Sequence, residues 1–291
     1  MSNSKSNTVG VIGLGIMGSA MSANLLKAGF VVQGYDVLPA RREDLKKAGG
    51  SPVSSLTGVE APIVITSLPS AETLHAVAGE MTAKCIVVET STLPIDDKIR
   101  ARDVLSRKSI TLLDCPLSGT GAQAKTKDLV VFASGDKSGF ERAKALFPGF
   151  SRSHFYLGAF GNGSRMKFVA NLLVAIHNVS AAEAFVLGMK AGLPAKTIFE
   201  VIENSAGTSR MFQVRGPQMV RGRYDGPGIA VGLFQKDMRI IGEFAARIGA
   251  PTSLFNASAA IYNAAMAQGH AGDDTAAVCA VLESMAKLRR R

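Results

Sequence analysis

The stretch VGVIGLGIMGSAMSANLLKAGFVVQGYD, residues 9–36, decides the fold class of the N-terminal half of this chain. Its first four residues, 9–12, form a short apolar run that predicts a strand. Residues 17–28 carry the three- and four-residue apolar spacing of a helix that ends before Gly29. Residues 31–35 predict a second strand. A strand, a tight turn, a helix and a second strand in this order indicate a parallel βαβ unit.

Gly13, Gly15 and Gly18 follow the first predicted strand with the spacing G-x-G-x-x-G. This spacing permits a tight turn, a close approach of the backbone to a pyrophosphate, and phosphate binding at the N-terminus of the following helix. A simple glycine turn would use the same three residues. The position of the motif between a strand and a helix favours a dinucleotide-binding site over that alternative.

Asp36 ends the second predicted strand, about 20 residues after the glycines. A carboxylate at this place accepts hydrogen bonds from the ribose hydroxyls of an adenosine and repels a 2′-phosphate, so we expect NAD to be preferred over NADP. The alternative is that Asp36 only caps the polar helix predicted at residues 41–48. Arg41 and Arg42 lie close enough in sequence to alter the cofactor preference.

Beyond residue 36 the pattern predicts two domains. Strands alternate with helices up to about residue 160, which indicates a mostly parallel, doubly wound α/β sheet of the Rossmann type. Four further strands are predicted at residues 63–67, 85–89, 110–113 and 129–133. One long helix is then predicted at 164–190, with helical blocks at 195–203, 231–248, 253–268 and 275–288. We therefore predict a NAD-binding domain at residues 1–160 and an all-helical substrate and dimerisation domain at residues 161–291.

The composition is that of a globular protein with a basic surface. Of the 291 residues, 47% are hydrophobic and 19% are charged, which excludes a disordered or fibrous chain. The 33 basic and 23 acidic residues give a net charge of +10, which is compatible with nucleic acid, an anionic membrane or small anionic ligands. The only dense basic cluster, Lys287 with residues 289–291, is expected to be a solvated tail. We expect no nucleic-acid partner.

Cysteine usage and the N-terminus indicate a cytoplasmic protein. No apolar run approaches the ~20 residues that cross a bilayer, and the polar residues 1–8 lack the apolar core of a signal peptide. We therefore expect no membrane. The three cysteines lack C-x-x-C spacing and the four histidines are scattered, so we expect neither a disulfide nor a metal site.

Two groups of polar residues predict the chemistry. Ser118 and Gly119 follow a predicted strand, where a hydroxyl and a backbone amide can form an anion pocket, although Ser118 could be only a turn residue. Lys167 and Asn171 are four residues apart on the long helix, so they share one face and can address one substrate hydroxyl. The alternative is an exposed lysine beside an asparagine that bonds to a neighbouring backbone.

These residues resemble the β-hydroxyacid dehydrogenase family, which includes 3-hydroxyisobutyrate, tartronate semialdehyde, L-threonate and 6-phosphogluconate dehydrogenases. The resemblance covers nearly the whole chain. It is carried by Gly-Leu-Gly-Ile-Met-Gly at 13–18, Leu-Pro at 68–69, Ser-Thr at 91–92, Asp-Cys-Pro-Leu-Ser-Gly at 114–119, Gly-Asn-Gly at 161–163 with Lys167 and Asn171, and Lys-Asp at 236–237. The chain departs from the family pattern at Glu89, where aspartate is common, at residues 120–122, and at Lys127, where glycine is frequent.

The resemblance implies a role for each matching residue. Together with Asp36, the residues expected to bind the cofactor are Gly13, Leu14, Gly15, Ile16, Met17, Gly18, Leu68, Pro69, Thr92 and Lys236. Ser118 and Gly119 are expected to hold the substrate carboxylate. Lys167 is expected to be the catalytic residue and Asn171 its companion. Lys236 could instead be a surface charge.

The sequence thus predicts an enzyme that transfers a hydride between NAD and a small 3-hydroxy carboxylic acid, such as 3-hydroxyisobutyrate or L-threonate. Lys167 would exchange the hydroxyl proton, and burial beside the cationic nicotinamide would lower its pKa from about 10.4. The alternatives are an NADPH-dependent reductase of glyoxylate or succinic semialdehyde and a non-catalytic nucleotide sensor. The length and apolar character of residues 164–190 predict a homodimer or homotetramer.

Overall fold

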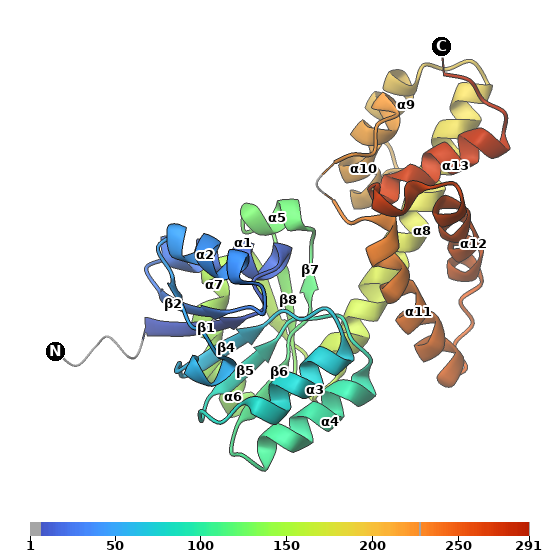
Figure 1. The fold of residues 1–291 in the computed structure, drawn as a ribbon. Helices are drawn as coiled ribbons and strands as arrows, with labels where there is room; N and C mark the ends of the chain where they lie inside the picture. Colours follow the sequence, from blue (N-terminus) through green and yellow to red (C-terminus); the bar gives the residue numbers. More distant parts are fainter. Residues whose placement is uncertain (1–6, 227, 291) are drawn as a thin grey trace. The chain divides into compact units, whose positions relative to one another are not determined.

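The computed structural model describes residues 7–226 and 228–290. Its contacts divide the chain into two compact units, Met1–Lys167 and Phe168–Arg291. In Figure 1 the strands belong to the first unit and the second is built from helices. Each unit is described by itself below.

The first unit contains a six-stranded parallel sheet in the order β3-β2-β1-β4-β5-β6. The strands are β1 (Thr8–Ile12), β2 (Val31–Tyr35), β3 (Ser51–Pro52), β4 (Ile63–Thr66), β5 (Ile86–Glu89) and β6 (Thr111–Asp114). The order reverses between β1 and β4. The carboxyl ends of the strands at such a reversal are the usual ligand site of an open parallel sheet. The predicted doubly wound Rossmann-type sheet is confirmed.

Helices cover both faces of this sheet, because its central strands are apolar on both sides. The helices are α1 (Ile16–Lys27), α2 (Pro39–Lys47), α3 (Ala71–Glu80) and α4 (Ile95–Ser106). One buried cluster joins Met21 and Leu25 of α1 to Val11 and Val32 of the sheet. A second joins the apolar residues of α3 and α4 to the other side of the same strands.

A small three-stranded sheet follows, and two of its strands were not predicted. Strand β8 (Val130–Ala133) pairs antiparallel with β7 (Leu117–Ser118) and parallel with β9 (Ser153–Tyr156). The short helices α5 (Gly121–Lys125), α6 (Lys137–Ala143) and α7 (Phe147–Phe150) connect these strands. Strand β7 is two residues long and β9 is polar, so neither has a periodicity that could be recognised.

The second unit is helical over its described residues, as predicted. Its helices are α8 (Asn162–Lys190), which begins in the first unit, α9 (Ala195–Ile202), α10 (Arg210–Arg221), α11 (Val231–Arg247), α12 (Ser253–Ala267) and α13 (Val278–Met285). Helix α10 was not predicted, because Gly216 and Pro217 interrupt its pattern. The block expected at 275–288 is a 3₁₀ turn, Thr275–Ala277, followed by α13.

Helix α8 is long and apolar enough to cross a membrane by length and composition, so the expectation that no segment reaches this length was wrong. Its buried polar residues bond to other parts of the helical unit. Asn178 is fully buried, and its Nδ2 donates to Tyr262 Oη at 3.1 Å and to Thr275 Oγ1 at 3.2 Å. These partners come from α12 and the turn before α13, so α8 packs inside the helical unit.

The C-terminal basic cluster is not wholly a solvated tail, and this expectation is corrected. The Arg290 guanidinium donates to the backbone oxygens of Met219 and Val220 at the end of α10, and to the Glu283 carboxylate. Those carbonyls have no partner within their own helix, so Arg290 caps α10. Arg291 lies outside the described residues.

Candidate active site

The glycine-rich loop joins β1 to α1 at the reversal of strand order. Gly13 has a φ of +89°, and a Cβ there would lie 2.2 Å from the Ser67 backbone oxygen. A Cβ on Gly18 would lie 1.8 Å from the Gly13 oxygen. Gly15 differs, because the only heavy atom near its Cβ position is Arg41 Nη1 at 3.7 Å. Gly13 and Gly18 are therefore needed for the fold, whereas Gly15 leaves open space at the N-terminus of α1.

The N-terminus of α1 can accept a phosphate. Gly15 is its N-cap residue, no side chain caps the helix, and there is no acidic residue in the first turn. Ile16 is 67% exposed at the tip of the loop, and Met17 is half-buried behind it. Unbonded amides and the helix dipole favour an anion here. This local geometry matches the shape of a dinucleotide pyrophosphate site.

Asp36 lies at the end of β2 and is bonded to the glycine loop. Its Oδ2 accepts from Leu14 N at 2.8 Å, and its Oδ1 accepts from Leu38 N at 2.9 Å. The Arg41 guanidinium forms an ion pair with Oδ2 at 3.2 Å, and Arg42 donates to the Asp36 backbone oxygen. Leu38, not Asp36, is the N-cap residue of α2. The Asp36 carboxylate therefore orients the glycine-rich loop, and the Arg41 guanidinium lies beside this carboxylate.

The loops after β4 and β5 are joined by one hydrogen bond. Leu68 is buried, and its backbone N–H donates to Ser91 Oγ at 2.7 Å, while the neighbouring Pro69 is exposed. Thr92 is half-buried directly after Ser91. Both loops leave the carboxyl edge of the sheet, on the far side of β1 from Asp36.

Ser118 and Gly119 lie next to the glycine-rich loop. Ser118 ends β7, and Gly119 has a φ of +134°, with a Cβ position only 2.6 Å from Leu129 Cδ2. Helix α5 then begins with a capping box in which Thr120 and Gln123 bond reciprocally. A Cβ on Gly121 would lie 2.5 Å from Ile16 Cγ2, so the first turn of α5 touches the tip of the glycine loop. The departure at residues 120–122 thus provides a helix cap.

Lys167 and Asn171 lie one turn apart on α8, and both are buried, with 6% and 4% of their surface exposed. The Asn171 amide donates from Nδ2 to Asp237 Oδ2 at 2.8 Å. Asp237 also forms an ion pair with Lys236, 3.6 Å from Nζ to Oδ1. The Lys236-Asp237 pair is therefore joined to Asn171 within the helical unit, and the bond fixes the orientation of the Asn171 amide.

Several buried polar residues at this edge were not identified as site residues. Lys98 of α4 bonds to the carboxylates of Glu89 and Asp114, and Asp114 holds the first turn of α8 through Ser164. Lys98 stands in the charged run IDDKIRARD, which is typical of a solvated helix. Its spacing from Ile95, Ala101 and Leu105 is the signal that was missed, because those three residues form the buried face of α4.

Cys115 lies inside the motif that contains Ser118 and belongs to a buried core cluster of the first unit. Its side chain is fully buried. Burial, together with the neighbouring Asp114 carboxylate, raises the pKa of the Cys115 thiol well above its usual range. A thiol that stays protonated is a poor nucleophile, so Cys115 packs the sheet edge.

The comparisons with known proteins cover both units. Residues 8–158 match the family model described as the NAD binding domain of 6-phosphogluconate dehydrogenase. Residues 161–282 match the one described as NAD-binding of NADP-dependent 3-hydroxyisobutyrate dehydrogenase. The L-threonate dehydrogenase of Cupriavidus necator is 32% identical over 283 residues, which cover 94% of this chain and 95% of that protein.

This chain belongs to the β-hydroxyacid dehydrogenase family. A second relative, glyoxylate/succinic semialdehyde reductase 1 of Arabidopsis thaliana, is 31% identical over 241 residues, covering 80% of this chain and 83% of its own. A solved structure of Mycobacterium tuberculosis 3-hydroxyisobutyrate dehydrogenase with L-serine has a TM-score of 0.85 and 29% identity, covering 95% of this chain and 99% of that one. As a member of this family, the protein is an oxidoreductase of hydroxy acids that uses a nicotinamide cofactor.

The residues present fit such a cofactor. The open space at Gly15 and the uncapped N-terminus of α1 suit a pyrophosphate, and the Asp36 carboxylate ends the strand beside them. The cofactor supplies a ring carbon that accepts or donates a hydride. The protein must supply the binding groups, the orientation of the substrate and a carrier for the hydroxyl proton.

Proposed function

We propose that this protein oxidises the hydroxyl group of a small 3-hydroxy carboxylic acid with NAD, and that Lys167 carries the proton. The observation that carries the proposal is Lys167 itself, whose side chain is buried one turn inside an apolar helix. Burying a lysine amine on an apolar helix is costly, so a lysine at such a place marks a candidate functional position. Asn171, one turn further along the same face, gives a second polar group at the same place.

Each polar residue has a part in the proposed reaction. Ser118 Oγ and the Gly119 amide hold the substrate carboxylate, and the positive φ of Gly119 supports this, because it turns the chain directly after the strand. The Lys167 amine takes the hydroxyl proton in oxidation and returns it in reduction. The Asn171 amide is oriented by Asp237 and positions the same hydroxyl. Lys236 contacts the cofactor.

The test removes the proton carrier from α8. Lys167→Met keeps most of the side-chain length, and we expect it to lower kcat by about 10²-fold to 10⁴-fold while the dissociation constant of NADH stays within twofold. The matched control is Lys190→Met on the last turn of the same helix, where the ammonium donates to the Ala286 backbone oxygen. Near-normal turnover in Lys167→Met would refute the assignment.

The substrate is identified by a panel of three- and four-carbon hydroxy acids with NAD at alkaline pH. We expect 3-hydroxyisobutyrate or L-threonate to give the highest kcat/KM, since relatives of this chain carry these names. A panel without activity on any 3-hydroxy acid would contradict the proposed substrate class.

A second candidate is the reduction of small aldehyde acids with NADPH. The observation that favours it is the position of Arg41, whose guanidinium lies against Asp36 and whose side chain is 46% exposed. A guanidinium there can bind a 2′-phosphate. The relative from Arabidopsis named as a glyoxylate/succinic semialdehyde reductase has the same family fold. Comparing kcat/KM for NADPH with glyoxylate against NAD with the hydroxy acids decides between the two.

We also propose a homodimer or homotetramer in the cytoplasm, with a domain boundary near residue 160. The support for assembly is a set of large apolar side chains exposed on the second unit: Val169, Leu173, Leu187, Leu233 and Leu254. Such side chains on several helices of one unit are typical of a covered interface. Light scattering at micromolar concentration tests this, and a monomer there would contradict it. The three buried free cysteines suit a reducing compartment.

A further inference from the structure

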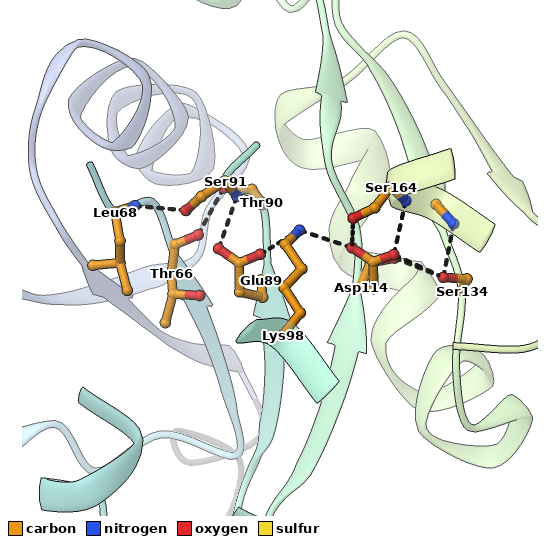
Figure 2. A network of polar contacts seen from close by, with 10 residues as sticks. Thr66, Leu68, Glu89, Thr90, Ser91, Lys98, Asp114, Ser134 and Ser164 are labelled. Carbon is orange, nitrogen blue, oxygen red and sulfur yellow. Dashed lines mark hydrogen bonds and ion pairs between the residues drawn. The ribbon is translucent and has the colours of Figure 1, made fainter. Parts of the chain in front are cut away.

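A fully buried lysine links two parts of the active site. Figure 2 shows Lys98 between Glu89 and Asp114 at the carboxyl ends of β5 and β6. The Lys98 ammonium lies 2.6 Å from Glu89 Oε2 and 2.8 Å from Asp114 Oδ1, and all three side chains are 0% exposed. The two carboxylates raise the pKa of Lys98 above its usual range despite the cost of burial, so the cation persists.

The first branch of this network holds the loops after β4 and β5. Glu89 Oε1 accepts from the Ser91 backbone N–H at 2.8 Å, and Ser91 Oγ accepts from the Leu68 N–H at 2.7 Å. A second hydrogen bond joins the ends of β4 and β5, because the Thr90 hydroxyl donates to the Thr66 backbone oxygen at 2.7 Å. Leu68 and Thr92 are among the residues expected to bind the cofactor. The Glu89 carboxylate therefore fixes the backbone of the two loops that contain Leu68 and Thr92.

The second branch holds the beginning of α8. Asp114 Oδ2 accepts from the Ser164 N–H and Asp114 Oδ1 from its hydroxyl, both at 2.8 Å. Ser134 Oγ donates to Asp114 Oδ2 at 3.2 Å and accepts from the Gly163 N–H at 2.9 Å. These bonds satisfy amides of the first turn of α8 that have no partner within the helix. Lys167 is three residues beyond Ser164.

Stability alone does not account for the buried cation. Replacing a buried ion pair with apolar residues of similar volume is often neutral or stabilising. The surroundings are apolar enough for such a replacement, since Ile95, Ala101 and Leu105 flank Lys98 on the buried face of α4. An apolar side chain could not bind two carboxylates from neighbouring strands at the same time.

We propose that Lys98 is a positioning residue that sets the distance between the cofactor-binding loops and the first turn of the helix that carries Lys167. The inference rests on the proposed function, in which Lys167 moves the proton, and on the expectation that Leu68 binds the cofactor. Its physical basis is that reaction rates respond steeply to displacements of about 1 Å between reacting groups. Lys98 touches neither substrate nor cofactor in this proposal and acts through Glu89 and Asp114.

The first test is Lys98→Met, read through NADH binding between pH 6 and pH 9. Without the ammonium, Glu89 and Asp114 repel each other, and one of them takes up a proton as the pH falls. The Cys115 thiol is the other titratable group at this point, and burial keeps it neutral. We expect the dissociation constant of NADH to rise at least tenfold from pH 6 to pH 9 in the variant and to change less than threefold in the wild type. A variant with the wild-type affinity at every pH would overturn the proposal.

The second test keeps the net charge of the cluster, so it remains decisive if Lys98→Met does not fold. In Glu89→Gln/Lys98→Met, Asp114 retains its serine donors and no second carboxylate faces it. We expect this double variant to lose the pH dependence of binding and to keep a fivefold to tenfold higher dissociation constant with a lower kcat, because the link between the branches is cut. Wild-type binding and kcat in the double variant would refute the positioning role.

The matched control is Lys108→Met. Lys108 lies just beyond the end of α4, and its ammonium donates to the backbone oxygens of Ala78, Gly79 and Met81 at the end of α3. We expect this variant to have a lower Tm and unchanged NADH binding. If the wild type itself does not bind NADH, the proposed function fails. If the wild type binds and the Lys98 variants bind equally well, only the present inference fails.

Discussion

Gly15→Ala separates the stability of the fold from cofactor binding. Gly15 has φ −68° and ψ −164°, which alanine adopts without strain, and the nearest atom to the new methyl group is Arg41 Nη1 at 3.7 Å. Replacing such a glycine removes freedom mainly from the unfolded chain. We expect the free energy of unfolding to rise by about 0.4–1 kcal/mol.

The same methyl group occupies the space through which a pyrophosphate would approach the backbone. Hydrogen bonds from amides to a charged phosphate contribute about 1.5–3 kcal/mol each. Loss of one such bond corresponds to a dissociation constant of NADH that rises by roughly 10-fold to 150-fold. We therefore expect a variant that is more stable than the wild type without cofactor and that gains little stability when cofactor is added.

The assay combines thermal unfolding without cofactor and titration of NADH fluorescence. The matched control is Gly79→Ala in α3, where no heavy atom lies within 4 Å of the new Cβ. It should be stabilised to a similar degree and should bind NADH like the wild type. If Gly15→Ala has an NADH affinity within twofold of the wild type, no phosphate binds close to Gly15, and the placement of the cofactor is wrong.

Two further predictions concern cofactor choice and alkaline pH. Asp36→Ser removes the carboxylate that repels a 2′-phosphate and frees Arg41 from its ion pair, so the ratio of kcat/KM for NAD to that for NADP should fall at least tenfold; an unchanged ratio would contradict the role of Asp36. Burial raises the pKa of Cys85 to about 11 and of Cys279 to about 12, above the unfolded value near 8.5. Their contribution to stability is therefore complete below about pH 8.5 and is lost as the pH rises toward the folded values. Iodoacetamide at pH 8 should leave the native thiols unmodified, and rapid labelling of either would refute their burial.

The larger elements of the fold were predictable because each reports its own periodicity. The apolar run of β1, the glycine spacing and the helix after it lie within 28 consecutive residues, so the βαβ unit can be recognised without any tertiary information. Strand β7 has only two residues and helix α10 contains Pro217, so tertiary contacts decide both. The missed elements are thus the ones whose local pattern is weak.

The candidate site likewise contains residues that the sequence could locate and contacts that it could not. The motif residues at 13–18 and 114–119 could be located by spacing and resemblance, because they are contiguous. The distant hydrogen-bond partners of the site residues could not be located from the sequence. Asn171 bonds to Asp237 across 66 positions, and Leu14 bonds to Asp36 across 22. Arg290 was expected in a solvated tail for the same reason, since its partners at Met219 and Val220 are about 70 residues away.

The position of Lys167 follows from contacts outside its own segment. Gly163, the second residue of α8, packs so closely that a Cβ there would lie 2.3 Å from the Phe132 oxygen and 2.6 Å from the Asp114 oxygen. The first turn is capped by Asp114, 50 positions earlier. Helix α8 therefore takes its place from the edge of β6 and β8. Lys167 is one turn from that contact, so the sheet also fixes the lysine, while Asn171 is set by Asp237 of α11. The two polar groups on one helix face thus have separate supports.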